Sequence, residues 1–193
     1  ANISDTGLRK KMQFNGSVLM LPNGVSFSVP SASQNIAFTS MWDNYPDVLQ
    51  VPVSGKARHA WLLMAGSTNP MQSRIVNGAV LVKYTDGTLD SLPLINPENW
   101  WPIEQDYIED GYQFARQTPR PPRVHLATGE VWMTAKPKYS SIKGMTNMAI
   151  DGGAATVVDI PLRADKTLQS IAWKSISNDV VIGTMAITLL QAD

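Results

Sequence analysis

The chain has 193 residues, of which 44% are hydrophobic and 17% are charged, a composition typical of a folded domain rather than a disordered segment. The 16 basic residues balance the 16 acidic ones, and a neutral chain lacks the surplus of cations that nucleic acids and anionic membrane surfaces attract. Because the sequence has no cysteine, disulfides and thiolate chemistry are excluded. No apolar run approaches the roughly 18 residues of a membrane-spanning helix, and residues 1–5 lack the features of a signal peptide. We therefore expect no nucleic-acid partner and no membrane insertion.

The first predicted element is a β-hairpin. Residues 1–11 are expected to be a disordered or linker-like start. Two runs of alternating apolar residues then flank Asn23-Gly24, and Asn-Gly between such runs is a strong hairpin signal. Further strands are predicted at 35–39 and 48–53, joined by a loop rich in Asp, Asn and Pro over residues 41–46.

The middle of the chain predicts a central strand followed by a second hairpin. Residues 59–65 are apolar at successive positions, as expected for a strand covered on both faces. After a loop with Gly66 and Pro70, alternating residues at 75–84 and 89–94 flank the turn Asp86-Gly87.

The segment 95–123 differs from the rest of the chain, because prolines, paired tryptophans and acidic residues dominate it. Proline at this density excludes a long helix or a central strand. A long irregular loop within a compact domain is usually functional, or it wraps around a neighbour.

Strand patterns return at 124–127 and 130–134, and residues 135–154 are expected to be mainly loop. Strands are then predicted near 157–162, 168–173 and 180–190, where apolar and polar residues alternate. Many short strands between Gly, Pro and Asx turns favour an all-β fold, a two-sheet antiparallel β-sandwich of the jelly-roll kind. No linker divides residues 1–193, so a single domain is expected.

Several stretches carry a resemblance to a known architecture. They are Ile36–Pro46, Val51–Ala57, Leu62–Gly66, Val82–Gly87, Asn99–Trp101, Leu168–Ile171 and Ile182–Thr188. Together they resemble a galactose-binding-like β-sandwich at the C-terminus of large bacterial glycoside-hydrolase-like proteins, a family known as a domain of unknown function. The resemblance covers about residues 35–190. It implies an accessory domain beside the catalytic domain of the same polypeptide, in the periplasm or at the cell surface.

Aromatic residues in the predicted loops are candidates for a sugar-binding platform. Sugars stack on aromatic rings while carboxylates and amides bind their hydroxyl groups. The candidates are Trp42, Asp43, Asn44, Tyr45, Asn99, Trp100, Trp101, Asp106 and Tyr107, with Tyr112 nearby. The alternative is that these aromatics plug the ends of the sandwich or pack against a neighbouring domain. Trp61, Trp132 and Trp173 lie in strand patterns and are expected in the core.

Support for catalysis or metal binding is weaker. The carboxylates of Glu104, Asp106, Glu109 and Asp110 could supply the pair that glycoside hydrolysis needs, but the favoured interpretation is a solvated acidic loop paired with Arg116, Arg120 and Arg123. His59 and His125 have no second ligand at a recognised spacing. We expect no catalytic residue, no metal ligand and no cofactor, and leave open a structural calcium ion held by loop carbonyl groups.

Two hypotheses of different classes follow, with a third behind them. The chain is a non-catalytic accessory domain that braces a catalytic domain, with glycan contact as an added role, or it is a carbohydrate-binding module with its own aromatic site. A binding module would expose aromatics in a groove, and a bracing module would expose a broad apolar patch. The third hypothesis, an autonomous glycoside hydrolase, requires two carboxylates in one cleft.

Overall fold

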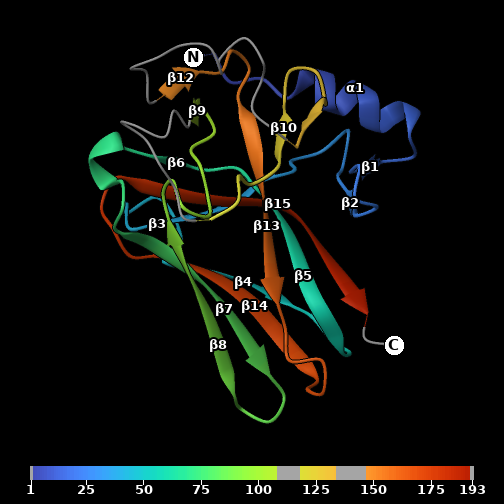
Figure 1. Ribbon diagram of the computed structural model, residues 1–193, viewed down its shortest axis with the longest axis vertical. Coiled ribbons are helices and arrows are strands. Elements are labelled where there is room, and N and C mark those ends of the chain that lie inside the picture. Colours follow the sequence, from blue (N-terminus) through green and yellow to red (C-terminus); the bar gives the residue numbers. More distant parts are fainter. Residues whose placement is uncertain (1, 108–117, 134–146, 192–193) are drawn as a thin grey trace.

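A computed structural model describes residues 2–107, 118–133 and 147–191. The chain is 49% strand and 7% helix, which confirms the all-β prediction. Two antiparallel sheets face each other and form a β-sandwich (Figure 1).

The elements follow each other in the order α1 (Thr6–Phe14), β1 (Val18–Met20), β2 (Ser26–Ser28), β3 (Ala37–Ser40), β4 (Val48–Pro52), β5 (Ala57–Met64), β6 (Ser67–Thr68), the 3-10 helix η1 (Pro70–Gln72), β7 (Val76–Tyr84), β8 (Leu89–Ile95), β9 (Gln105–Tyr107), β10 (Arg123–His125), β11 (Val131–Trp132), β12 (Asn147–Ala149), β13 (Ala154–Pro161), β14 (Leu168–Ser175) and β15 (Val180–Gln191). Both predicted hairpin turns are present, with Gly24 at φ 86° and Gly87 at φ 84°, backbone angles that glycine adopts without strain. The segment 95–123 is less irregular than predicted, because β9 lies within it and pairs with β12.

The strand order is that of a jelly roll. The first sheet has the order β11-β10-β13-β5-β15-β3, and the second has the order β4-β14-β7-β8. Consecutive long strands therefore alternate between the two sheets except at the β7–β8 hairpin, which is the pattern of a jelly roll built from two Greek keys. The connections β4–β5, β7–β8 and β13–β14 lie at one end of the sandwich, and the longer connections lie at the other (Figure 1).

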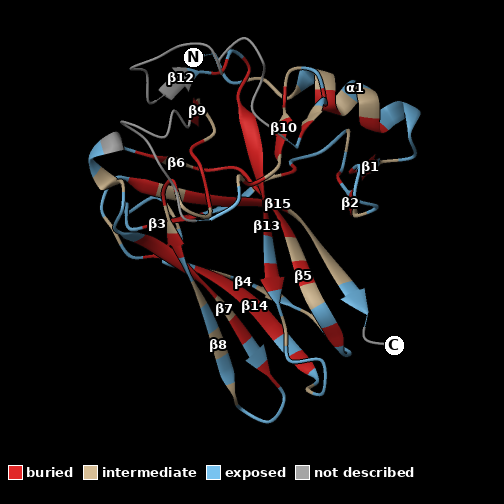
Figure 2. Cartoon of the chain, in the orientation of Figure 1, coloured by how far each residue is buried: buried red, intermediate tan, exposed pale blue. Residues whose placement is uncertain are grey.

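The main core lies between the sheets and is buried along its length (Figure 2). Val80, Val82 and Tyr84 alternate along β7 and all point inward, as the two-residue period of a strand dictates. Trp173 of β14 is fully buried in this cluster, as predicted.

A second cluster covers the outer face of the first sheet. On β5, Leu62 belongs to the main core while Leu63 faces this outer cluster. The prediction that residues 59–65 form a strand covered on both faces is therefore confirmed. The β1–β2 hairpin supplies Leu19 and Phe27 to the same cluster.

The N-terminal segment differs from its predicted linker-like start, because α1 begins at Thr6. Leu8 and Met12, one turn apart, are buried in the outer cluster, and these two residues alone give too weak a helical pattern to identify from sequence. The carboxylate of Asp5 accepts hydrogen bonds from Arg9 and Asn35 at 2.8 and 3.0 Å. Burial acts to raise the pKa of Asp5, but these bonds outweigh it and hold that pKa below its ordinary value of 3.8.

Candidate functional site

The structure divides the predicted sugar-contact residues between two regions. Trp42, Asp43, Asn44 and Tyr45 lie in the exposed loop between β3 and β4. Asn99, Trp100 and Trp101 lie in the connection after β8, and Asp106 and Tyr107 lie in β9. All of these except Asn99 are buried. Of the remaining acidic-stretch and aromatic candidates, Glu109, Asp110, Tyr112 and Arg116 lie outside the described residues.

The β3–β4 loop presents the exposed aromatic pair. Trp42 is 47% exposed and Tyr45 is half-buried. Their ring centroids lie 6.1 Å apart at an interplanar angle of 58°, and the edge of Tyr45 meets Phe38 of β3 in a T-shaped contact at 6.3 Å. The Tyr45 ring therefore packs against Phe38 of β3 on one side and against Trp42 on the other.

Hydrogen bonds fix the shape of this loop. The Tyr45 N–H donates to the Trp42 carbonyl at 2.9 Å, and the Thr39 hydroxyl donates to the Pro46 carbonyl at 2.6 Å. The Ser40 hydroxyl accepts from the Trp42 N–H at 3.3 Å. Trp42 and Tyr45 are thus held on a defined turn, beside the exposed polar groups of the two residues between them.

Trp100 and Trp101 are core residues, each 1% exposed. The Trp100 indole N–H donates to the side-chain oxygen of Asn77 at 3.1 Å, and that of Trp101 donates to the Pro97 carbonyl at 2.7 Å. Tyr107 packs its edge against Trp101 with centroids 5.0 Å apart. Burial raises the pKa of Tyr107. A sugar cannot stack on rings enclosed in this way, so the packing alternative describes this part of the predicted platform.

The acidic stretch is only partly solvated. Asp106 is buried and pairs with Arg120 at 2.6 Å, and the Arg120 guanidinium lies 4.4 Å from the centroid of the Trp101 ring, a cation–π contact. Glu104 accepts a hydrogen bond from Ser67 at 2.8 Å. The sequence correctly pairs Asp106 with an arginine but wrongly places it in solvent.

Two buried polar residues, Arg123 and Asn77, have structural roles that the sequence analysis did not predict. Arg123 donates from its guanidinium to the carbonyls of Gln105, Pro102 and Ala154 at 2.8–3.0 Å, and burial lowers its pKa to about 10. The Asn77 side chain accepts from Trp100 and from a backbone N–H. An amide within the apolar run of β7 is the signal that could have identified it, because a buried polar group needs a partner.

Asn99 has a structural role. Its side-chain oxygen accepts from the Ile95 N–H at 2.9 Å, and its amide donates to the Pro93 carbonyl at 2.8 Å. Asn99 therefore closes the turn after β8, and both ends of its side chain are engaged within the chain.

Large apolar side chains gather at the end of the sandwich that carries the longer connections. They lie in three connections, β3–β4, β6–β7 and β14–β15, which meet where β15 pairs with both β3 and β6. Met71 is 85% exposed, and Met41, Trp42, Ile75 and Ile176 are each 47–51% exposed. We call these five residues the apolar end.

A cleft of about 420 Å³ lies beside residues 118–122 and between the two sheets. Glu98 and Asp159 both line it, which meets the minimum condition for the glycosidase hypothesis. Each carboxylate, however, already contacts a basic group at 2.8 Å, Glu98 with Arg74 and Asp159 with His59. Glu98 is thus held in an ion pair with Arg74 and Asp159 in a contact with the His59 ring, which is not the arrangement of an acid and a nucleophile that face one bond.

The described residues contain no group of three or more His, Cys, Asp or Glu side chains that could hold a metal ion. His125 contacts the Thr128 hydroxyl and the Asp151 carbonyl through its two ring nitrogens, both at 2.8 Å, and stacks on Trp132. Its ring therefore has a structural role. Among the helices described, none is long and apolar enough to cross a membrane.

Comparison with known proteins adds no relative. No protein-family model matches the chain, no curated protein matches it, and no solved structure matches it.

Proposed function

We propose that the chain is a non-catalytic jelly-roll module that docks on a neighbouring protein domain through its apolar end. The observation that supports the proposal is the exposure of five large apolar side chains on three adjacent connections. Single exposed apolar residues are ordinary, whereas a group of them marks an interaction surface. The resemblance implies that this neighbour is the catalytic domain of the same exported polypeptide, and we include that identity of the neighbour in the proposal.

The docking surface differs from the one that the sequence suggests. Segment 95–123 is the expected bracing element, but its described aromatic residues, Trp100, Trp101 and Tyr107, are buried within this chain. They have little surface to offer a partner. The apolar end does, and its connections are anchored by hydrogen bonds such as those from the Ile176 and Ser177 N–H groups to the Asn77 carbonyl at 2.9 and 3.1 Å.

The test uses a charge on each side of the apolar end. Tagged wild-type chain and a Met71→Asp, Ile176→Asp double variant, each produced as the isolated 193 residues, are purified from cells that also make the natural protein, and co-purifying proteins are quantified. The control is Leu89→Asp, since Leu89 is 55% exposed but is the first residue of β8, next to the β7–β8 connection at the opposite end of the sandwich (Figure 1). We expect one partner to be lost with the double variant and retained with the control. A partner set that does not change, or that both variants lose equally, refutes the proposal.

Glycan binding by the β3–β4 loop is a second candidate. The support is the exposed Trp42 ring next to Tyr45, with the carboxylate of Asp43 and the amide of Asn44 exposed beside them. Tryptophan fluorescence titrated with a glycan panel tests it. A saturable shift that Trp42→Ala abolishes, and that the aspartate double variant of the apolar end retains, supports a sugar site. A flat response from folded protein refutes it.

A further inference from the structure

Strand β15 has a bare edge over its C-terminal half. On the side away from β5, β3 pairs with β15 only from Val181 to Thr184. Beyond Thr184, no described strand pairs with that side of β15, although pairing with β5 continues to Gln191. The strand runs out toward the C-terminus along the margin of the sheet (Figure 1). Strand β2 contacts this half of β15 through its Ser26 carbonyl, which accepts a hydrogen bond from the Thr188 hydroxyl. The outward backbone N–H and C=O groups of β15 have no described backbone partner there and are available to pair with another strand.

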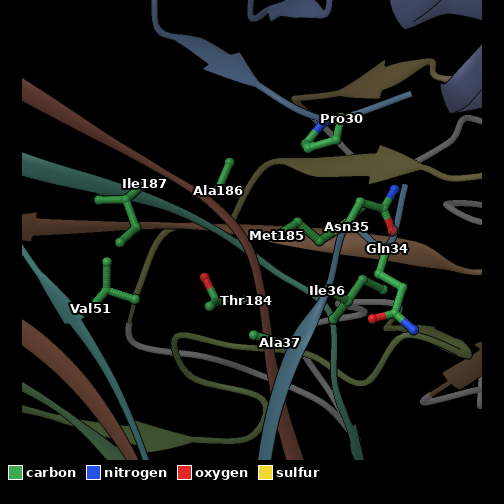
Figure 3. Close-up of a pocket in the computed structure, with 10 residues that line it drawn as sticks. All are labelled: Pro30, Gln34, Asn35, Ile36, Ala37, Val51, Thr184, Met185, Ala186 and Ile187. Atoms are coloured by element: carbon green, nitrogen blue, oxygen red, sulfur yellow. The ribbon is translucent and has the colours of Figure 1, made fainter. Parts of the chain in front are cut away.

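A groove of about 450 Å³ opens beside this edge. It lies where the segment before β3 leaves β15, and Val51 of β4 forms its opposite wall (Figure 3). Met185 is the extra residue of a β-bulge in β15, because Thr184 pairs with Met64 and Ala186 with the preceding Leu63. Bulges of this kind occur next to functional sites and at sheet edges.

Thr184 places a buried hydroxyl beside this groove. It is 7% exposed, and its hydroxyl finds no partner among the described residues. In Figure 3 the hydroxyl points into the space between Val51 and Ile187. A buried donor without an acceptor is unfavourable, so an occupant that brings a carbonyl group into the groove would relieve it.

The two sides of the sandwich differ in how their edges are protected. On the side of the sandwich opposite to β15 and β3, the exposed strand edges carry charged residues and proline. These are Asp159 and Pro161 in β13, and Asp90 and Pro93 in β8. Residues 184–191 of β15 contain neither a charged residue nor proline. Soluble proteins use such residues to block strand addition. Their absence from residues 184–191 leaves this edge of β15 unprotected against strand addition.

We propose that the bare edge of β15 binds the same edge of a second copy of this chain, so that residues 185–191 of the two copies pair antiparallel across a two-fold axis. Antiparallel pairing of identical strands is self-complementary, as a two-fold interface requires. The occupant must be an uncharged strand, since the edge offers no charge to complement. A second copy meets this condition, and the zero net charge of the chain gives no long-range repulsion between copies.

This pairing also closes the groove. Ile187 and Leu189 point inward at the margin of the main core and are half-buried. In the dimer they would lie beside the same residues of the second copy, as neighbours on one face of a continuous sheet. A stable dimer needs about 800 Å² from each partner, so the groove walls at 30–37 and Val51 must contribute along with the strand.

The mass of the chain at increasing concentration, measured by sedimentation equilibrium, tests the proposal. We expect a reversible rise from one 21.1 kDa chain to two. Ile187→Lys should weaken the association at least tenfold. Leu92→Lys is the matched control, because Leu92 is also half-buried against the main core but lies on β8 at the other side. A wild-type chain that stays monomeric to millimolar concentration, or equal effects of the two lysines, overturns the proposal.

A second measurement does not depend on introducing a charge. The chain has no cysteine, so Thr188→Cys introduces a single thiol at the half-buried position of β15 that a two-fold pairing of residues 185–191 sets opposite itself, as a disulfide requires. We expect the Thr188→Cys variant to form covalent dimers on mild oxidation much faster than Leu89→Cys, whose position is 55% exposed on β8. Amides of residues 185–191 should also exchange more slowly as concentration rises. Equal crosslinking and protection that appears only after another protein is added would assign the edge to that other partner and refute the second copy.

Discussion

Truncation of Trp100 and of Trp42 should affect stability very differently, although the sequence places both in one platform. Trp100 is 1% exposed and packs in the main core, with its indole N–H bound to Asn77. Trp42 is 47% exposed on the β3–β4 loop. The two alanine variants therefore separate a core residue from a surface residue.

The structure gives the size of the difference. A fully buried aromatic side chain removes about 150–250 Å² from water, which at about 25 cal/mol per Å² corresponds to about 4–6 kcal/mol. Measured truncations of buried Trp and Phe cost about 3–5 kcal/mol. Asn77 keeps a second donor, the Asn96 N–H, so no further large penalty for an unpaired acceptor is expected. Trp100→Ala should therefore lower the free energy of unfolding by about 3–5 kcal/mol, and Trp42→Ala by about 0.5 kcal/mol or less.

Urea denaturation followed by far-ultraviolet circular dichroism measures both values without relying on tryptophan fluorescence. Trp100→Phe should recover part of the loss, since it restores most of the apolar volume. Equal destabilisation by Trp42→Ala and Trp100→Ala would show that the loop tryptophan also packs in the core. A Trp100→Ala variant as stable as wild type would contradict the burial argument itself.

Three further predictions concern other buried or constrained groups. Asp106→Asn should lower the free energy of unfolding by about 3–5 kcal/mol, because it leaves Arg120 buried without its counter-ion. In a double-mutant cycle measured by urea unfolding, the Asp106→Leu, Arg120→Met double variant should lose less free energy of unfolding than the sum of the losses in Asp106→Leu and Arg120→Met. Gly183→Ala should lower the free energy of unfolding by about 3 kcal/mol or more, because the added Cβ would lie 1.9 Å from a backbone oxygen. Gly87→Ala has open space around it and is opposed only by its φ of 84°, so it should lower the free energy of unfolding by about 1–2 kcal/mol. Thermal or urea unfolding measures both values. The pKa of Asp5 is lowered in the folded chain, so the contribution of Asp5 to stability is present above pH 3.8 and is lost as pH falls through the folded pKa. The melting temperature of Asp5→Asn should therefore fall less between pH 6 and pH 3 than that of the wild-type chain. An equal fall in both proteins would count against this role of Asp5.

The strands and turns were predictable because local rules govern them. Asn23-Gly24 and Asp86-Gly87 form the expected hairpin turns, since glycine at positive φ is needed there and the flanking residues alternate. The apolar run at 59–65 also predicted a strand covered on both faces. Helix α1 was missed, because it depends on Leu8 and Met12 docking on the outer face of β5 and β13 rather than on its own pattern.

The candidate site was less predictable than the fold. Trp42 and Trp100 have the same residue type and similar loop-like surroundings in sequence, with Asx and proline nearby. One is exposed and the other is core, because Trp100 meets Asn77 from a strand more than twenty positions earlier. Arg123 is similar, since its three carbonyl acceptors come from separate parts of the chain.

The sequence by itself determined the class of the fold, most of its strands and its tight turns, because alternation and backbone preference act between residues close in the chain. Only the tertiary structure decided which aromatics reach solvent, where the apolar end gathers and which edge of β15 stays bare. Those features arise where distant segments meet: β3 covers β15 only as far as Thr184, and no local pattern in either strand states where that pairing stops.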